Sequence, residues 1–420
     1  MKTWRRTLKW RQKEPTASDM SSTITCPMPH LGQLEILQSP ARFKVLACGR
    51  RWGKSELGLL DIIRAAHLEH KYCWWVAPTY LMANRIWRKI LNAVKHLKGV
   101  LIDQTHRHID LPKGGVIAIR SAHNPDKLRG DGLDFVVLDE AARMPAHIWH
   151  DVIRPMLATT RGAARFLSTP NGRNWFWERH RDGCDPLQEE WAAFDFSTGQ
   201  SDLVDQAELE SIRRNTAEHI WECEYEAKFS DDRGQVFRRI SAAAAPAPYD
   251  RPQPGHAYVA GVDWGRSKDY TAIAVLDAAN GKMVALERFN QVGWELQRER
   301  LAQIAAKWRP QVIWAEANSI GEPNIDALLR GGLPVRRFYT SAKTKAPLIE
   351  ALALAIERQD ITLLDDPVLL GELADYRFDR LPNGGYRYGA PTGGHDDTVI
   401  AAALAWYGAQ HSSRSILDFA

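Results

Sequence analysis

The sequence predicts two α/β domains, one with a parallel sheet and one with a mixed sheet. In the first half, an apolar run at 43–47 leads into a loop with two glycines, and a second apolar run at 135–138 ends in two acids. In the second half, three strand-like segments precede alternating helices and strands. Strands that alternate with helices are typical of α/β domains, so we expect helices on the faces of both sheets.

The loop Cys48-Gly49-Arg50-Arg51-Trp52-Gly53-Lys54-Ser55 has the composition of a phosphate-binding loop. Such a loop wraps N–H groups around nucleotide phosphates, with Lys54 reaching the β- and γ-phosphates and Ser55 holding Mg²⁺. The glycine usually found five places before Gly53 is Cys48 here, and Gly49 comes one place later. A Gly-Lys-Ser surface turn is the alternative meaning of this loop taken alone.

The apolar strand at 135–138 ends in Asp139 and Glu140, the two carboxylates that such an ATPase needs. Asp139 is expected to hold Mg²⁺, and Glu140 to activate the attacking water. A strand that runs into a solvated loop is the alternative. Because the phosphate loop and this strand occur together, we favour ATP hydrolysis.

Three further segments of the first half are candidates for the same site. Ser168 and Thr169 follow a strand at 164–167, where hydroxyls are well placed to sense a γ-phosphate, although Pro-Asn-Gly makes a turn there in any case. Arg129 precedes the carboxylate strand as a surface charge or as part of a phosphate site. Gln33 lies on a helix upstream of the loop, where helicase-like ATPases place an adenine-reading glutamine. The residues expected to contact ATP are therefore Gln33, Gly49, Arg50, Arg51, Gly53, Lys54 and Ser55.

The composition is that of a soluble globular protein, with 45% hydrophobic and 25% charged residues in 420. We find no membrane-length apolar run and no signal-peptide pattern, so we expect a cytoplasmic protein. The five cysteines lack zinc-site spacing, and a net charge of +4 permits a polyanionic partner without requiring one. The expected organisation is a flexible basic arm at 1–20, an ATPase domain at 21–240, an Ala/Pro-rich linker at 241–255 and a second domain at 256–420.

The second domain has the element order of a ribonuclease-H-like fold, and acids stand at the ends of its expected strands. Asp263 ends the first strand, Glu316 ends the fourth, and Asp396 and Asp397 open the last helix. Oxygen ligands suit Mg²⁺ or Mn²⁺, and two such ions about 4 Å apart promote phosphodiester cleavage. Consecutive helical residues diverge by about 100°, so we favour Asp397 as the inward ligand and Asp396 as a cap or second ligand, with Asp269 assisting. Surface or capping acids are the alternative.

Taken together, five segments resemble the large subunit of tailed-bacteriophage DNA-packaging terminases. They are Ala-Cys-Gly-Arg-Arg-Trp-Gly-Lys-Ser, Val-Val-Leu-Asp-Glu-Ala, Ser-Thr-Pro-Asn-Gly, Gly-Val-Asp-Trp-Gly and Gly-His-Asp-Asp-Thr. The resemblance implies an ATP-driven motor that threads duplex DNA into a procapsid, and a two-metal nuclease that cuts concatemers. It also implies a portal protein, a small terminase subunit and a ring of self-associated copies as partners, no membrane, and a location in the cytoplasm of the bacterial host outside the mature virion.

The resemblance also implies roles for individual residues. Lys54 and Ser55 match the phosphate and Mg²⁺ contacts, and Ser168 and Thr169 match the motif that couples hydrolysis to movement. Arg129 matches an arginine offered to the neighbouring subunit's nucleotide. The remaining matches are Asp139 and Glu140 for the ATPase, Asp263, Glu316 and Asp397 for the nuclease metals, and, less closely, Gln33 for adenine.

Two other functions compete with this interpretation. One is a helicase-like DNA-dependent ATPase with a degenerate second domain, which metal-dependent DNA cleavage would exclude. The other is an ATP-binding structural protein without turnover, which we disfavour because Glu140 is present.

Overall fold

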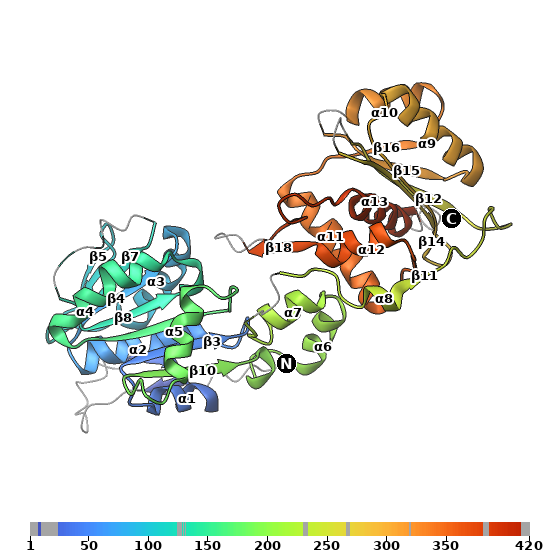
Figure 1. Ribbon diagram of the computed structural model, residues 1–420. Helices are drawn as coiled ribbons and strands as arrows, with labels where there is room; N and C mark the ends of the chain where they lie inside the picture. The colour runs from blue at the N-terminus through green and yellow to red at the C-terminus, as the bar shows by residue number, and fades with distance from the viewer. Residues whose placement is uncertain are drawn as a thin grey trace. The chain divides into compact units, whose positions relative to one another are not determined.

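The computed structural model of the protein describes residues 7–9, 24–123, 128, 130, 132–229, 234–265, 269–318, 321–380 and 386–412. These residues form two compact units (Figure 1). The first contains the described parts of 1–212 and 220–231, and the second contains 213–219 and most of the chain after 232. No helix among the described residues is both long and apolar enough to cross a bilayer.

An eight-stranded sheet of order β10-β3-β9-β8-β4-β7-β6-β5 organises the first unit. The strands from β10 to β7 run parallel, and β6 and β5 extend the sheet in the antiparallel sense. The parallel sheet predicted from the βαβ spacing is therefore confirmed. The strands are β3 (Phe43–Cys48), β4 (Tyr72–Ala77), β5 (Leu101–Asp103), β6 (His108–Asp110), β7 (Val116–Ser121), β8 (Phe135–Asp139), β9 (Ala163–Ser168) and β10 (Trp191–Phe196).

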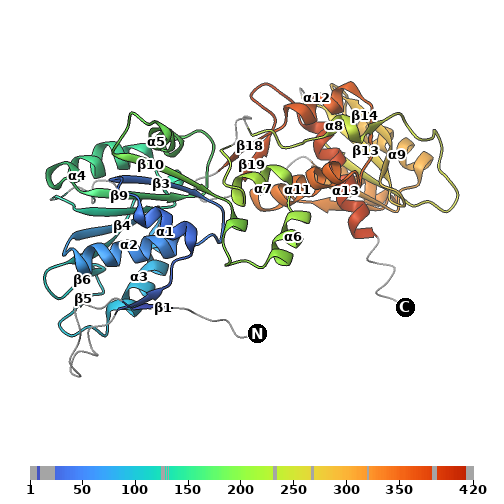
Figure 2. The ribbon, with the colours of Figure 1, turned by 90° about the horizontal axis from the view of Figure 1, so that it is seen from below.

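Helices cover both faces of this sheet (Figure 2). Alternate residues of β4 show how: Cys73 and Trp75 pack in one apolar cluster, and Trp74 and Val76 pack in the other. A strand buried on both faces has a continuous apolar sequence, as the central strands here do. One face carries α1 (Leu31–Gln38), α2 (Lys54–Leu68) and α3 (Tyr80–Val94), and the other carries α4 (Arg154–Thr160) and α5 (Trp175–Cys184).

The second unit contains a five-stranded sheet of order β14-β13-β12-β15-β16. Strands β12, β13 and β14 form an antiparallel meander, and β15 and β16 continue parallel to β12. This is the strand order predicted for a ribonuclease-H-like fold. The strands are β12 (Tyr258–Asp263), β13 (Thr271–Asp277), β14 (Lys282–Phe289), β15 (Val312–Glu316) and β16 (Val335–Phe338).

Two groups of helices enclose the second sheet (Figure 1). Leu301 and Trp308 of α9 (Trp294–Trp308) and Ile325 of α10 (Gly321–Arg330) share an apolar cluster with Tyr258 and Ala260 of β12. On the opposite face α13 (Asp397–Ser412) packs against β12 and β13. The elements around α13 are α11 (Ala342–Arg358), α12 (Pro367–Asp375), and the hairpin β18 (Arg377–Arg380) and β19 (Tyr386–Gly389).

The predicted linker at 241–255 belongs to the second unit, and the chain changes unit between residues 212 and 232. Residues 240–245 form α8 (Ile240–Ala243) and β11 (Ala244–Ala245), and β11 pairs with β17 (Leu363–Leu364). Farther along, the Tyr249 ring packs near Trp308, and the Gln253 N–H donates to the Tyr258 hydroxyl over 2.8 Å. Proline-rich composition shows that regular structure is absent but does not show whether side chains hold the segment in place.

The flexible arm expected at 1–20 contains one segment that the structure describes. Residues Thr7–Lys9 form β1, which pairs antiparallel with β2 (Thr25–Pro27). Backbone pairing uses only N–H and C=O groups, so a basic composition does not exclude it. The sequence prediction also missed β10, α5, α6 (Gln206–Arg214) and α7 (Glu218–Glu224), which lie between the recognisable motifs and the second unit.

A buried ion pair connects α2 to β9 beneath the first sheet. Asp61 accepts from Arg165 Nε over 2.6 Å, and Arg64 lies 2.9 Å from its other oxygen. Burial raises the pKa of Asp61, but the two guanidinium groups outweigh it and hold the pKa below its usual value. Lys44 is buried nearby and donates to the Ile36 carbonyl over 2.6 Å.

Replacing Asp61 by alanine should lower the free energy of unfolding by about 3–5 kcal/mol, because Arg165 is left buried without its partner. Since the folded pKa is depressed, the stabilisation is present above the unfolded pKa and is lost as pH falls through the folded value. The difference from wild type, measured by denaturant titration, should therefore shrink in acid. Asp151→Ala, exposed in the helical turns before α4, is the control and should change stability by less than about 0.5 kcal/mol.

Candidate functional site

The phosphate-binding loop of the first unit lies between β3 and α2, at the edge where the parallel strands end. Its first half is held by backbone hydrogen bonds: the Gly49 N–H donates to the Phe196 carbonyl (2.8 Å), and the Arg50 N–H donates to the Glu224 carbonyl (2.7 Å). The Thr198 hydroxyl donates to the Arg50 carbonyl over 2.7 Å. Segments far along the chain therefore fix the loop, and no local sequence signal identifies them.

Gly49 is required by close approach of backbone. A Cβ atom there would lie 2.4 Å from the Tyr225 carbonyl oxygen and 2.5 Å from the Thr198 hydroxyl. No larger residue fits this space without moving the segments that hold the loop. The shifted glycine therefore has a structural cause.

The second half of the loop is held from the other side. Gln33 is buried and donates from Nε2 to the Gly53 carbonyl over 2.9 Å, while its Oε1 accepts the His30 N–H over 3.1 Å. Gly53 itself caps α2 in the left-handed region, with φ 106°. In this structure the amide of Gln33 is thus engaged with the loop, and its contact with adenine stays a prediction.

Lys54, Ser55, Asp139 and Glu140 come together at the sheet edge. The Ser55 hydroxyl donates to Asp139 Oδ1 over 3.3 Å, and Lys54 Nζ lies 3.6 Å from Glu140 Oε1. Burial and the neighbouring Glu140 raise the pKa of Asp139 to about 7. The loop and the carboxylate strand, 84 residues apart in sequence between Ser55 and Asp139, form one polar site.

Glu140 adopts a strained backbone conformation that aims its carboxylate at this site. Its φ is 55° and its ψ 45°, the left-handed region that residues other than glycine seldom occupy. Such strain persists where surrounding structure imposes it, often at functional sites. Arg143, which the sequence analysis missed, lies with Nε 3.5 Å from Glu140 Oε2, so the carboxylate sits between Lys54 and Arg143.

Ser168 and Thr169 lie buried at the end of β9, next to the loop that follows Glu140. The Ser168 hydroxyl accepts the Ala142 N–H over 3.3 Å. Asn171 and Asn174 donate to the Ala142 carbonyl over 3.3 and 2.7 Å. Ser168 and the segment after it are therefore linked through Ala142 to the loop that follows Glu140.

The arginines predicted at this site differ in placement. Arg50 Nε pairs with Glu224, whereas Arg51 is exposed and has a φ of 62°. Arg129 lies outside the described residues, so its role stays a prediction.

In the second unit, the predicted carboxylates converge at the ends of β12 and β15. Val262 pairs with Ala315 in the parallel register, so Asp263 and Glu316 follow at neighbouring positions. Burial raises the pKa of Asp263 far above its usual value, and the hydrogen bond and charge of Glu316 raise it further. The charges of Asp397 and Asp396 act in the same direction.

Asp397 and Asp396 open α13 and face different partners. Asp397 is buried, with Oδ2 3.5 Å from Arg288 Nη2 and 3.7 Å from His395 Nδ1. Asp396 is less buried and accepts from Lys345 over 3.0 Å. Burial and the nearby Glu372 raise the pKa of Asp397 to about 6. This placement agrees with Asp397 as the inward residue.

The sequence analysis missed two participants, the buried Glu372 and the half-buried Arg288. Glu372 accepts the Thr398 N–H over 2.9 Å, and also its hydroxyl, and so caps the first turn of α13. Arg288 lies 3.1 Å from Glu372 and packs over the Tyr270 ring. Their only sequence signal is a charged residue within an otherwise apolar segment.

The carboxylates fit a hard divalent cation in donor type. They are oxygen-only ligands, and burial followed by the neighbouring carboxylates raises the pKa of Asp263 and of Asp397, a cost that a bound cation would offset. The described residues nevertheless contain no assembled group of three His, Cys, Asp or Glu side chains at metal-binding distances. Arg288 and Lys345 hold Asp397 and Asp396 in ion pairs. Asp269 is exposed in the loop after β12.

Comparison with known proteins matches this pairing of sites. The family model for the N-terminal part of the T4likevirus-type terminase large subunit matches residues 45–243. The terminase large subunit of Thermus virus P23-45 is 29% identical over 427 residues, which cover 90% of this chain and 87% of that protein.

One solved structure shares the fold over most of the chain. The large terminase of a thermophilic bacteriophage aligns with 90% of this chain and 98% of its own at 15% identity, with a TM-score of 0.52. The large terminase ATPase domain of Thermus phage P74-26 covers 49% of this chain and 95% of its own, at 27% identity and a TM-score of 0.43. The large terminase nuclease of the thermophilic phage G20c, solved with bound magnesium, covers 41% and 97%, at 28% identity and a TM-score of 0.39.

The first unit therefore has the fold of a phosphate-loop domain, and the second has a ribonuclease-H-like fold. The resemblance to bacteriophage terminase large subunits that the five motifs predicted is confirmed. The function predicted from the motifs, a viral DNA-packaging motor and nuclease, agrees with these relatives.

Gly49→Ala should destabilise the first unit by about 1–3 kcal/mol, because the added methyl group cannot be accommodated beside Tyr225 and Thr198. Gly130→Ala, where no atom lies within 4 Å of the added carbon, is the matched control and should have little effect. Thermal unfolding of both variants measures the difference. Equal melting temperatures would mean that the loop is not held as described.

Proposed function

We propose that the first unit hydrolyses ATP to drive duplex DNA into a procapsid, and that the second unit cuts DNA with the help of two Mg²⁺ or Mn²⁺ ions. The observation that carries this proposal is that each unit gathers its own acidic side chains where its parallel strands end. A helicase-like ATPase would have no use for the second cluster.

In the ATPase site, the side chains divide the chemistry of phosphoryl transfer. Lys54 is placed to contact the β- and γ-phosphates, and Ser55 and Asp139 to hold Mg²⁺, which would neutralise charge on the phosphates. Glu140 would orient the attacking water and accept its proton. In this structure Glu140 shares its carboxylate between Lys54 and Arg143. When phosphate draws Lys54 away, Arg143 remains as the group that positions Glu140.

Ser168 and Thr169 are placed to couple hydrolysis to movement. Ser168 contacts Ala142, two residues after Glu140. Nearby, the Cys223 thiol donates to the Pro170 carbonyl over 3.1 Å. A shift of the catalytic loop would therefore reach the segment after β9 and then the end of α7 through direct hydrogen bonds.

In the nuclease site, Asp263, Glu316 and Asp397 would hold the metal ions, with Asp396 as a further ligand. Bound ions would activate a water and stabilise the leaving oxygen. Glu372 keeps the first turn of α13 in place, and with it the Asp397 carboxylate. Arg288 and Lys345 compensate the carboxylate charges in this structure, so each must release its partner when a cation binds.

The proposed partners follow from the family. They are duplex DNA, the portal protein of the procapsid, a small terminase subunit and further copies of this chain in a ring, where Arg129 would reach the neighbouring nucleotide. The proposed location is the cytoplasm of the bacterial host, outside the mature virion.

Glu140→Gln should lower the rate of ATP hydrolysis by about 10² to 10⁴ while leaving ATP binding intact, because the amide cannot accept a proton. Phosphate release and nucleotide affinity measured on the same protein separate the two effects. Glu189→Gln, at an exposed site before β10, is the control and should behave as wild type. Retention of full turnover by Glu140→Gln would exclude its proposed role.

Asp263→Asn and Asp397→Asn should each reduce metal-dependent DNA cleavage at least about 100-fold, because the remaining ligands no longer position the ions. ATP hydrolysis should be unchanged, and calorimetry should show weaker Mn²⁺ binding. Asp250→Asn, exposed in the same unit, serves as control. If wild type fails to cut DNA with Mn²⁺ while hydrolysing ATP, the helicase-like alternative holds.

A further inference from the structure

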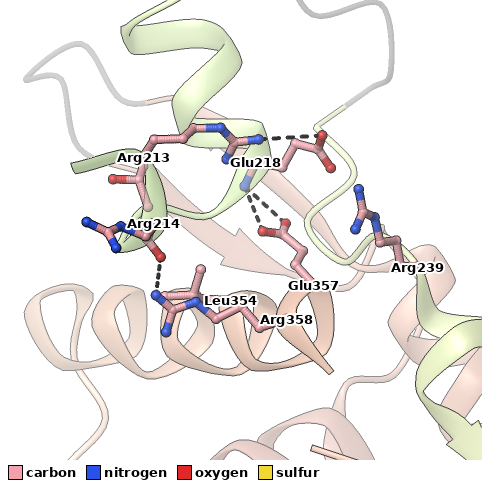
Figure 3. Close-up of a pocket in the computed structure, with 8 residues that line it drawn as sticks. Arg213, Arg214, Glu218, Arg239, Leu354, Glu357 and Arg358 are labelled. Carbon is pink, nitrogen blue, oxygen red and sulfur yellow. Dashed lines mark hydrogen bonds and ion pairs between the residues drawn. The ribbon is translucent and has the colours of Figure 1, made fainter. Parts of the chain in front are cut away.

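The second unit contains a cavity of about 260 Å³ between the α6–α7 segment and the C-terminal end of α11 (Figure 3). Arginines dominate its lining, together with two carboxylates. The charged residues are Arg213, Arg214, Arg239, Arg358, Glu218 and Glu357. None of them belongs to the sites described above.

The two carboxylates of the cavity are already compensated. Glu218 lies 3.8 Å from Arg213 and 3.9 Å from Arg238. Both oxygens of Glu357 accept the Glu218 N–H, over 3.0 and 2.9 Å. Burial raises the pKa of Glu357 to about 7, so its negative charge is only partly present near neutrality. The cavity therefore keeps an excess of positive charge.

That excess resides mainly on Arg214 and Arg239. Both side chains are exposed, and within the described part of the chain neither guanidinium group has an ion pair or hydrogen bond. They lie on either side of Glu357 (Figure 3). Arg358 completes the rim and is held in place by its bond from Nη2 to Asn215 Oδ1 (3.2 Å).

Arg239 has a second unusual feature, since its backbone lies in the left-handed region with φ 58° and ψ 25°. Glycine or asparagine adopts this conformation at lower cost. The Arg239 side chain lines the cavity and has no ion-pair or hydrogen-bond partner among the described residues, so its charge is available to a ligand.

The cavity is separate from the nuclease carboxylates. Lys345 contacts Asp396 near the start of α11, whereas Glu357 and Arg358 lie at its end. At 1.5 Å per residue the separation is about 20 Å, and at 100° per residue the two positions face different sides of the helix. A group bound in the cavity is therefore not the phosphodiester being cut.

We propose that this cavity binds a phosphate group, and that on duplex DNA it is a backbone phosphate away from the point of cleavage. The planar guanidinium fork matches phosphate oxygens in pairs, so the uncompensated guanidinium groups of Arg214 and Arg239 are suited to a phosphate. That the phosphate belongs to duplex DNA rests on the proposed function. That the cavity binds a phosphate group does not.

The test uses the full chain without ATP and with EDTA, so that neither activity interferes. Binding of a short fluorescent duplex should weaken at least about tenfold in Arg214→Ala/Arg239→Ala, because two charged hydrogen-bond donors are lost. The slope of log K against log salt should fall by about 1. Arg330→Ala, exposed at the end of α10, is the matched control and should bind as wild type.

A second experiment, thermal unfolding with inorganic phosphate, identifies the source of the phosphate. Inorganic phosphate should raise the melting temperature of wild type and of Arg330→Ala but not of the double alanine variant. If this protection is seen while DNA binding is unaffected, the ligand is free phosphate, which supports the site but not its use on DNA. Arg214→Lys/Arg239→Lys should bind more weakly than wild type, and full retention would contradict a paired guanidinium site.

The inference is overturned if the double alanine variant, melting as wild type in phosphate-free buffer, loses neither phosphate protection nor DNA affinity. The cavity would then accept another acidic group, such as a carboxylate of a partner protein. If wild type does not bind DNA at all, the proposed function fails. The melting temperatures with inorganic phosphate then still show whether the cavity binds a phosphate group.

Discussion

Carboxylates that lie side by side at the ends of parallel strands, where solvent reaches them only in part, are the constraint on which both units depend. Like charges in a poorly solvated edge repel one another, and the raised pKa values of Asp139 and Asp263 record this cost. Each unit supplies cations to offset it: Lys54 and Arg143 around Glu140, and Arg288 beside Asp397. The same arrangement makes each edge attractive to Mg²⁺, so the destabilising feature and the proposed chemistry have one origin.

The cations have to be exchangeable for such sites to function. A phosphate must draw Lys54 from Glu140, and a metal must displace Arg288 from Asp397. The supporting contacts are of a different kind, because they are backbone or buried hydrogen bonds that need not break. Two examples are the hydrogen bond from the Thr198 hydroxyl to the Arg50 carbonyl and the one from the Thr398 N–H to Glu372. Each site thus combines a rigid frame with a few replaceable ion pairs.

Sequence reasoning succeeded where a local pattern has one physical meaning. The apolar strands, the loop before α2 and the order of strands in the second unit were all predicted, because burial on both faces leaves a continuous apolar run. It failed for β10 and α7, whose importance comes from touching a loop far away in sequence. The segment expected as a linker, 241–255, lies within the second compact unit.

The sequence by itself determined the fold class and the resemblance to terminase large subunits, since these depend on residue type and spacing along the chain. Only the tertiary structure decided which groups face those acids. Arg143, Arg288 and Glu372 are ordinary charged residues in the sequence and become significant because folding brings them within 3.5 Å of Glu140, Asp397 or one another. The arginine cavity has the same origin, because segments more than 100 residues apart form it. Coulomb and hydrogen-bond energies depend on distance in space, which spacing along the chain does not specify.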